Sequence, residues 1–427
     1  MSTPSRRDFA RLLALSGAAA ALPRTARAWD HVTSAPLPQT PTPPGEAFWQ
    51  DVRRRFLIPE GVAFFNAANL CPASLAAVEA HEKNLRAYEA DPSPAFRSSL
   101  MAERETSRKL LAAMLRVTPE DIVITRNTSE SNNWVSSGLD FKAGDEVVVW
   151  ADNHPTNLSA WRTKATRFGF TVVTVPTPPR HPGDDGYVDL FTKAFTPRTK
   201  LVALTHVSSN SGDRLPVDAI CAAARSRGIL SLVDGAQAFG VLDLDLGAMQ
   251  PDFYTGSMHK WPCGPKEKGL LYAHRGVHDR LHPSIVGLYG GQVGLSRTFE
   301  ANGQRDDASI AAVTAALQFR ERIGRDVIER RSVALAEALM DGLAKLPGVT
   351  LWTDRAAGRH AAIVIFQPGS LDPRRLGAAL LENDRIVVTV RGGASNPGLR
   401  ISPHFFNTMA EIDRTVAAIR GYLAKGV

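Results

Sequence analysis

Two short stretches of the chain, VDGAQAFG at 233–240 and SMHKWPCG at 257–264, carry the residues best suited to chemistry. Asp234 ends an apolar run, Gln237 follows three residues later, and Lys260 closes a Ser-x-His-Lys motif. Pyridoxal phosphate (PLP) needs an anion against its ring nitrogen, a hydrogen bond to its phenolic oxygen and a lysine for its aldehyde. We assign these roles to Asp234, Gln237 and Lys260 in that order and expect PLP as the cofactor.

Lys260 is favoured over the lysines that follow it. An attacking amine must be partly desolvated, and Trp261 and Pro262 beside it would help to exclude water. Lys266 and Lys268 lie in a polar turn and are expected to be solvated.

A run of small polar residues after the apolar stretch DIVIT (121–125) predicts a phosphate site. A helix that begins there offers free N–H groups and the positive end of its dipole. A plain helix cap would look similar in sequence. The residues assigned to the phosphate are Thr128, Ser129 and Glu130, together with Ser257 and His259 of the lysine motif.

Other polar residues follow expected strands and complete the site. His154 is expected to stack over the cofactor ring, with an ordinary turn histidine as the alternative. Ser209 and Asn210 would approach the phenolic oxygen or the substrate carboxylate. Arg400 would hold that carboxylate in a bidentate pair, with a surface ion pair as the alternative, and Arg391 is a second candidate.

The elements that must position these residues are short apolar runs, most of which start 22 to 30 residues apart. This spacing fits strand, crossover helix, strand, and the apolar composition fits a parallel sheet covered on both faces. No crossover helix fits between residues 257 and 269, so the last strand should run antiparallel. The expected strands of this mostly parallel seven-stranded α/β sheet are 121–125, 146–150, 171–175, 201–207, 230–234, 252–257 and 269–273.

After residue 307 the pattern changes to two helical stretches, and then to strands expected at 349–352, 361–366 and 385–390. A helix capped at Asn407-Thr408 and running through Tyr422 closes the chain. The predicted organisation is a signal peptide (1–28), a proline-rich linker (29–46), an N-terminal segment that packs on the small domain (47–75), a large PLP-binding domain (76–306) and a small α+β C-terminal domain (307–427).

The first 28 residues resemble a twin-arginine export signal. Arg6 and Arg7 precede an apolar stretch, and Ala26-Arg27-Ala28 makes a small-x-small cleavage site. The apolar stretch is about a dozen residues long, whereas a transmembrane helix needs roughly 20. We therefore expect export through the twin-arginine (Tat) translocon, cleavage after Ala28, a periplasmic location and no membrane anchor afterwards. An amphipathic N-terminal helix is the alternative.

Charge and cysteine content exclude several other classes. The net charge is +7, but residues 1–28 carry five arginines and one aspartate, so the rest of the chain has a net charge of +3. With no stripe of arginines interleaved with aromatic residues, no nucleic-acid partner is expected. Cys71, Cys221 and Cys263 lack metal-ligand spacing. No metal is expected, and one disulfide is possible although none is expected.

Together the motifs D-x-x-Q (234–237) and S-x-H-K (257–260) resemble those of fold-type I PLP enzymes of aminotransferase class V, close to isopenicillin N epimerase and the cysteine desulfurases. The resemblance runs from about Phe56 to Leu423. It implies a homodimer whose partner subunit completes each active site, with 299–306 as the crossing segment. Gln304 stands where a threonine is usual. The loop 392–399 lacks the cysteine on which desulfurases form a persulfide, and Cys263 lies beside the lysine instead.

The leading functional hypothesis is therefore a PLP enzyme acting on a primary amine next to a carboxylate, with the α-carbon bond that breaks left open. An export signal on this fold resembles the periplasmic enzymes of pyoverdine siderophore maturation. That resemblance implies a glutamyl side chain on a siderophore peptide, with free α-amino and α-carboxylate groups, that becomes a succinamide. The alternatives are a C–S lyase, epimerase or aminotransferase acting on a small amino acid, and a catalytically inactive binding protein on a PLP fold.

Overall fold

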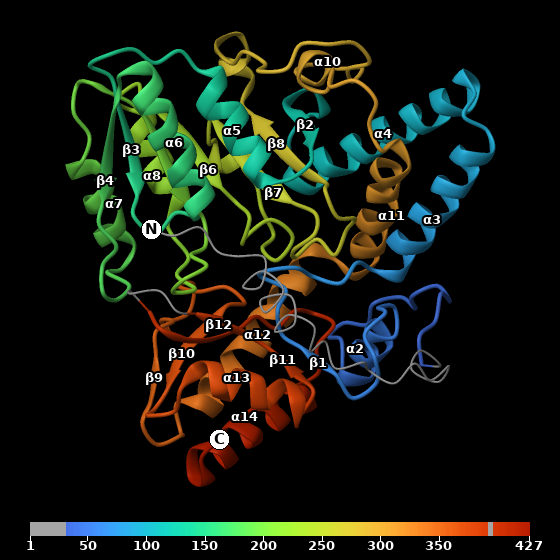
Figure 1. The fold of residues 1–427 in the computed structure, drawn as a ribbon, viewed down its shortest axis with the longest axis vertical. Helices are drawn as coiled ribbons and strands as arrows, with labels where there is room; N and C mark the ends of the chain where they lie inside the picture. Colours follow the sequence, from blue (N-terminus) through green and yellow to red (C-terminus); the bar gives the residue numbers. More distant parts are fainter. Residues whose placement is uncertain (1–30, 392–395) are drawn as a thin grey trace, which may run out of the picture.

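Figure 1 shows a larger α/β part above a smaller α+β part, with the chain that precedes α3 passing between them. The computed structural model describes residues 31–391 and 396–427. The predicted signal peptide, the first two residues of the predicted linker and part of the loop 392–399 lie outside the described residues.

The central sheet has seven strands in the order β2-β8-β7-β6-β5-β3-β4. Only β8 runs against the others: it pairs antiparallel with both β2 and β7, whereas β7, β6, β5, β3 and β4 pair in parallel. The mostly parallel sheet and its antiparallel last strand are thus confirmed. The strands are β2 (Ile122–Thr125), β3 (Glu146–Trp150), β4 (Thr171–Val175), β5 (Thr199–Thr205), β6 (Leu230–Asp234), β7 (Phe253–Ser257) and β8 (Gly269–Ala273).

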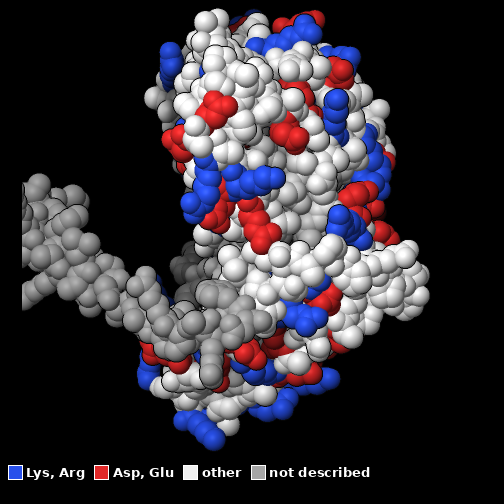
Figure 2. Space-filling model, turned by 90° about the vertical axis from the view of Figure 1, so that its right-hand side faces the viewer, with Lys and Arg blue, Asp and Glu red and all other residues white. Residues whose placement is uncertain are grey.

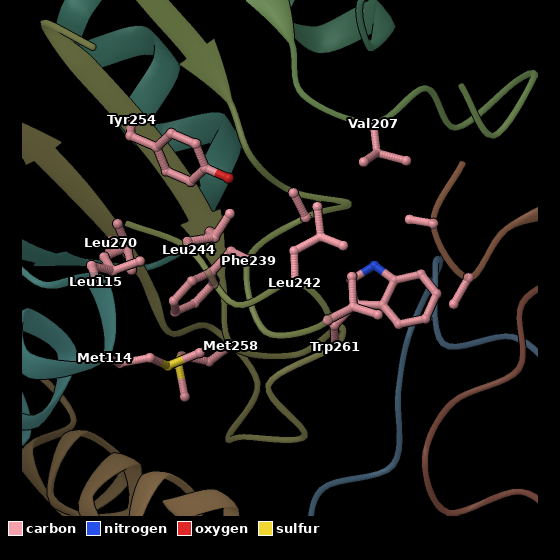
Figure 3. Close-up of a cluster of buried hydrophobic side chains, with 14 of the residues drawn as sticks. Met114, Leu115, Val207, Phe239, Leu242, Leu244, Tyr254, Met258, Trp261 and Leu270 are labelled. Carbon is pink, nitrogen blue, oxygen red and sulfur yellow. The ribbon is translucent and has the colours of Figure 1, made fainter. Parts of the chain in front are cut away.

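Both faces of this sheet are buried, as its apolar sequence predicts. Val148 of β3 belongs to one hydrophobic cluster, and its neighbours Val147 and Val149 belong to another on the opposite face. Figure 3 shows part of the first cluster, where Met114 of α4 and Phe239, which follows β6, lie among the labelled side chains. Helices α4 (Pro94–Leu115), α7 (Asp184–Lys193) and α8 (Val217–Arg225) supply the first cluster; α5 (Thr128–Gly138) and α6 (Pro155–Phe168) supply the second.

A layer of helices beside the sheet connects the two parts. Helix α11 (Asp307–Ile323) packs against α3 (Leu75–Ala90) and α4, as Figure 1 shows at the right of the view. Helix α12 (Arg325–Leu343) follows after Gly324 and leads into the smaller part. Shorter elements are α2 (Glu46–Arg53), α9 (Leu246–Met249), α10 (Ser296–Phe299) and the 3₁₀ turns η2 (Pro119–Asp121) and η3 (Arg275–Arg280).

The smaller part is a four-stranded antiparallel sheet in the order β12-β13-β10-β9. The single strand expected at 385–390 is wrong, because the chain divides it into two. Strand β11 (Ile386–Val387) pairs in parallel with β1 (Ala63–Phe64) of the N-terminal segment. Strand β12 (Thr389–Arg391) pairs with β13 in the four-stranded sheet. The other elements are β9 (Val349–Leu351), β10 (Val364–Pro368), α13 (Pro373–Glu382), β13 (Gly398–Ile401) and α14 (Met409–Lys425).

Two general features of the molecule are the mixture of charges on its surface and the length and apolarity of its helices. In Figure 2 basic and acidic side chains are interspersed over the face that is shown. Within residues 31–391 and 396–427, no helix is long and apolar enough to cross a membrane.

Candidate active site

Asp234 lies at the carboxyl end of β6, at the edge where open α/β sheets bind their ligands. Its side chain is buried, and two donors fix the carboxylate. Asn132 Nδ2 donates to Oδ2 at 2.9 Å, and the Ala236 backbone N–H donates to Oδ1 at 3.1 Å. Thr255 Oγ1 in turn donates to Asn132 Oδ1 at 3.0 Å. The carboxylate is therefore held in one orientation before any ligand binds.

Lys260 lies in the turn after β7 and is partly buried. Burial lowers the pKa of its amine to about 8; the nearby charge of Asp234 opposes this, and that of Arg400 adds to it. Two predicted residues, Asp234 and Arg400, thus both act electrostatically on Lys260. With a pKa near 8, a useful fraction of the amine is neutral and nucleophilic at neutral pH.

Gln237 connects the turn that carries the lysine to the N-terminal segment. Its Oε1 accepts from Trp261 Nε1 at 2.9 Å, and its Nε2 donates to the Ala68 carbonyl at 2.9 Å. Because an amide nitrogen carries two hydrogens, one Nε2 hydrogen is left for the phenolic oxygen of the predicted cofactor. That role stays a prediction.

Residues assigned to the phosphate meet at the start of α5, where two segments far apart in the sequence come together, and their role stays a prediction. Ser257 Oγ accepts from the Thr128 N–H at 2.9 Å and bonds to Thr128 Oγ1 at 2.7 Å. His259, from the same turn as Lys260, is partly buried, and burial lowers the pKa of its imidazole to about 4. These residues, with Ser129 in the first turn of the helix, fit a phosphate.

Glu130 is bonded to neighbouring protein groups, and its assignment to the phosphate stays a prediction. Its N–H donates to the side chain of Asn127, the N-cap of α5, at 3.0 Å. Its carboxylate bonds to the guanidinium of Arg126. Both groups are therefore committed, and its negative charge would oppose a phosphate. Asn127 is the capping residue that the sequence analysis missed, although an asparagine directly before a helix is a known capping signal.

His154 is the N-cap of α6, and its Nδ1 accepts from the Thr156 N–H at 3.3 Å. The pKa of its imidazole is lowered, first by desolvation and then by the positive charges of Lys260, Arg391 and Arg400, while Asp234 acts in the opposite direction. The ring therefore lies within electrostatic reach of the whole predicted site. Stacking over the cofactor stays a prediction for this residue.

Arg400 of β13 is the clearest candidate for a substrate carboxylate. Its side chain is buried, with only 4% of the residue exposed. Nη1 makes a long contact of 3.4 Å with the Ser209 carbonyl, and Nε has no hydrogen-bond partner within the described residues. Burial and the charge of Arg391 lower its pKa to about 9. A buried cation with an unpaired N–H is unfavourable until an anion binds it.

Arg391 belongs to a network that the sequence analysis saw only in part. Its Nη2 donates to Asn210 Oδ1, and Asn210 Nδ2 donates to Asp152 Oδ1 at 2.5 Å. Ser208 Oγ donates to the other oxygen of Asp152. Burial raises the pKa of Asp152, against the effect of these partners. Asn210 is thus bonded at both ends of its amide and positions Arg391; Asp152, two residues before His154, was missed.

The mostly parallel sheet, the turn after β7 that carries Lys260 and the buried carboxylate of Asp234 at the end of β6 define a PLP-dependent enzyme of fold type I. The family model for aminotransferase class V matches residues 64–415. The chain belongs to this family, and its cofactor is PLP. Among the described residues, no three His, Cys, Asp or Glu side chains gather in a way that would hold a metal ion.

Relatives of known name cover most of the chain. Isopenicillin N epimerase of Streptomyces clavuligerus is 31% identical over 392 residues, which cover 87% of this chain and 98% of the epimerase. A probable cysteine desulfurase of Pyrococcus abyssi is 29% identical over 395 residues, covering 85% of this chain and 95% of the desulfurase. The similarity to this branch of the family is therefore confirmed.

Solved structures agree. A lysine-to-alanine variant of C-DES, with glycine covalently linked to its PLP, aligns with a TM-score of 0.79 at 27% identity, over 86% of this chain and 98% of that one. Another structure of C-DES is described as a cystine C–S lyase in complex with its product, cysteine persulfide.

Proposed function

We propose that this PLP enzyme acts at the α-carbon of a substrate with a free α-amino group and a free α-carboxylate. The observation that carries this proposal is Arg400, a buried guanidinium whose Nε has no hydrogen-bond partner among the described residues and whose charge acts on Lys260. A carboxylate bound there would lie within electrostatic reach of the lysine amine, as suits a substrate whose carboxylate and amine share the α-carbon.

Each residue then has a distinct task. When bound, PLP supplies the sink for the electron pair released at the α-carbon. Asp234 holds a proton on the ring nitrogen, and Asn132 keeps that carboxylate aimed at it. Lys260, once its amine is free, moves a proton to or from the α-carbon. Arg400 fixes the carboxylate and thereby selects which bond at the α-carbon stands perpendicular to the ring.

The finer form of the proposal is a periplasmic enzyme that tailors the glutamyl side chain of a pyoverdine precursor to succinamide. It is supported by the resemblance of residues 1–28 to a twin-arginine signal. Those residues lie outside the described part of the chain. The siderophore peptide and the translocon are proposed partners on that basis alone.

Mass spectrometry of siderophore intermediates tests the finer form. Periplasmic extracts of cells with the gene should contain the succinamide product, and cells that carry the Lys260→Ala variant should accumulate the glutamyl precursor. Identical products in both strains would remove the pyoverdine proposal. The visible absorption of purified protein, which reports bound PLP, would still test the cofactor site independently.

A second candidate is a lyase or epimerase on a small amino acid. It is favoured by the names of the relatives, which include an epimerase and a cystine C–S lyase. Purified enzyme would be offered cystine and a panel of L-amino acids. Pyruvate formation would support the lyase, and exchange of the α-proton with deuterated water, together with loss of optical rotation, would support the epimerase. Family membership favours either of these over an inactive binding protein.

A further inference from the structure

Two of the three cysteines meet in the interior, next to the active site. Cys71 and Cys263 are both buried, and their Sγ atoms lie 3.5 Å apart although 192 residues separate them in sequence. Cys71 belongs to residues 66–74, here called the cover segment, which runs from β1 to α3. Cys263 belongs to the lysine turn, residues 257–264.

The backbone holds the two segments in register on both sides of the thiols. The Cys71 N–H donates to the His259 carbonyl at 2.8 Å, and the Ser74 N–H donates to the Cys263 carbonyl at 2.9 Å. The Ala68 carbonyl accepts from Gln237, so the cover segment is also bonded to the strand-end loop that carries Asp234. A disulfide needs sulfurs about 2.05 Å apart, so they must approach by roughly 1.5 Å. Forming the bond therefore requires the two side chains to rotate toward each other.

The surroundings of the pair favour a thiolate at Cys263. Burial raises the pKa of its thiol, but the hydrogen bond with Cys71, the nearby His404 side chain and the positive charge of Arg320 outweigh burial, so the pKa lies below its usual value. Burial raises the pKa of Cys71. The Cys263 thiol, whose Sγ donates to the Trp261 carbonyl at 3.5 Å, therefore loses its proton more readily than the Cys71 thiol does.

We infer that Cys71 and Cys263 form a disulfide that fastens the cover segment to the lysine turn. The oxidant is an external disulfide, either of a thiol–disulfide oxidoreductase or of oxidised glutathione. The Cys263 thiolate attacks one of its sulfurs and releases one thiolate, which takes up a proton. The Cys71 thiolate then attacks Cys263 Sγ and releases the second. The two cysteines lose two protons and two electrons, and the external disulfide is reduced to two thiols.

The oxidant reaches the pair by local opening of the cover segment. Leu70, next to Cys71, is 48% exposed, so the segment borders solvent. Once formed, the bond ties together the residues on both sides of Lys260, because His259 and Cys263 are then both joined to the cover segment. The disulfide should therefore slow any opening that lets PLP leave, and should raise thermal stability by constraining the unfolded chain.

The test uses purified holoenzyme incubated with oxidised glutathione or with dithiothreitol, then denatured in the presence of iodoacetamide. The oxidised sample should carry one alkylated cysteine, Cys221, and a cross-linked peptide that joins Cys71 to Cys263. The reduced sample should carry three. Three alkylated cysteines after oxidation, a bridge to Cys221, or glutathione adducts without a bridge would each overturn the inference.

Two measurements on the same samples test whether the disulfide slows the release of PLP and raises thermal stability, which we call its closing role. Oxidised holoenzyme should lose PLP to a scavenger several-fold more slowly than reduced holoenzyme, and its melting temperature should be higher by roughly 5 °C. Cys71→Ser and Cys263→Ser should each abolish the difference between oxidised and reduced samples, whereas Cys221→Ser should retain it. Equal PLP release in both redox forms of the unsubstituted chain would overturn the closing role.

Discussion

A single guanidinium determines how the substrate is bound in our proposal. Replacing Arg400 by lysine keeps a positive charge but removes the planar fork that pairs with a carboxylate. We expect kcat/KM to fall about 100-fold or more, about 3 kcal/mol in transition-state binding, while the visible absorption of bound PLP persists. Steady-state kinetics and the absorption spectrum check this. Arg391→Lys is the matched control, and an equal loss in both variants would contradict the separate role of Arg400.

Lys260 should impose a pH dependence on cofactor uptake. Because burial lowers its pKa from 10.5 to about 8, the amine is mostly protonated below pH 8 and cannot attack. The rate constant for PLP uptake by the apoenzyme should therefore rise roughly tenfold per pH unit below about 8 and level off above it. Stopped-flow absorbance measures this profile.

Substitution of the neighbouring Arg400 tests whether the pH profile of PLP uptake reports the pKa of Lys260. The positive charge of Arg400 lowers the pKa of Lys260, so Arg400→Gln should move the midpoint of the uptake profile to higher pH. Lys266→Gln, which removes a charge from the polar turn beyond the lysine, should leave the midpoint in place. A midpoint near pH 10 in the unsubstituted enzyme would show that burial does not act on this amine as described.

At the residue scale, the sequence pointed to the groups proposed to bind a ligand more readily than to the groups that position them. Asp234, Lys260 and Arg400 were found because each follows or occupies an apolar run and has a chemical type that PLP chemistry demands. Asn132 and Asp152 were missed because their task is to bond another side chain. Their partners lie on other elements, at positions set by the register of the sheet rather than by nearby sequence.

At the scale of elements, the apolar runs located the strands because a parallel strand buried on both faces has little freedom in composition. Prolines and a glycine between residues 257 and 269 excluded a crossover helix and so predicted the reversed β8. The division of 385–390 into β11 and β12 had no comparable signal. Strand β11 exists because β1, more than 300 residues earlier, pairs with it, and local periodicity carries no information about such a distant partner.

The close approach of Gly235 to the ring of Tyr254 in the next strand should make Gly235 sensitive to substitution. A Cβ built at Gly235 would lie 2.1 Å from the ring of Tyr254, which is fully buried in β7. Gly235→Ala must therefore displace the end of β6, and we expect a loss of roughly 1–3 kcal/mol of stability with weaker retention of PLP, since Asp234 moves as well. Thermal denaturation and cofactor titration measure the two effects.

A glycine in open space provides the comparison for that prediction. A Cβ at Gly421 in α14 meets nothing within 4 Å, so Gly421→Ala should be neutral or should stabilise by up to about 1 kcal/mol through helix propensity. If both alanine variants melt at the temperature of the unsubstituted protein, the contact between β6 and β7 is looser than described.

At the scale of the whole molecule, segments distant in sequence complete one another. The N-terminal segment pairs with the smaller part through β1 and covers the lysine turn through residues 66–74. The sequence analysis predicted the first of these contacts. The second depends on the meeting of Cys71 with Cys263, which no sequence spacing reveals. The active site is thus assembled from the N-terminal segment, the central sheet and β13 together.

We propose that the molecule is a homodimer joined beside the segment 299–306. Four large apolar residues of one loop are exposed, led by Val286 at 86% and Leu288 at 72%. An exposed apolar cluster of this kind marks an interaction surface. The loop adjoins the proposed crossing segment, because a Cβ at Gly287 would lie 2.5 Å from the Ala301 carbonyl oxygen. A second copy of this chain is the occupant that the family resemblance implies.

Charge placed on that loop should separate the subunits. We expect the double variant Val286→Glu, Leu288→Glu to sediment as a monomer at concentrations where the unsubstituted chain sediments at twice the chain mass, because both copies would bury like charges. Leu381→Glu, on an exposed apolar residue of α13, is the control and should remain dimeric. If the partner subunit completes the active site, the monomeric variant should also bind PLP more weakly than the control. A dimeric double variant would place the interface elsewhere on the surface.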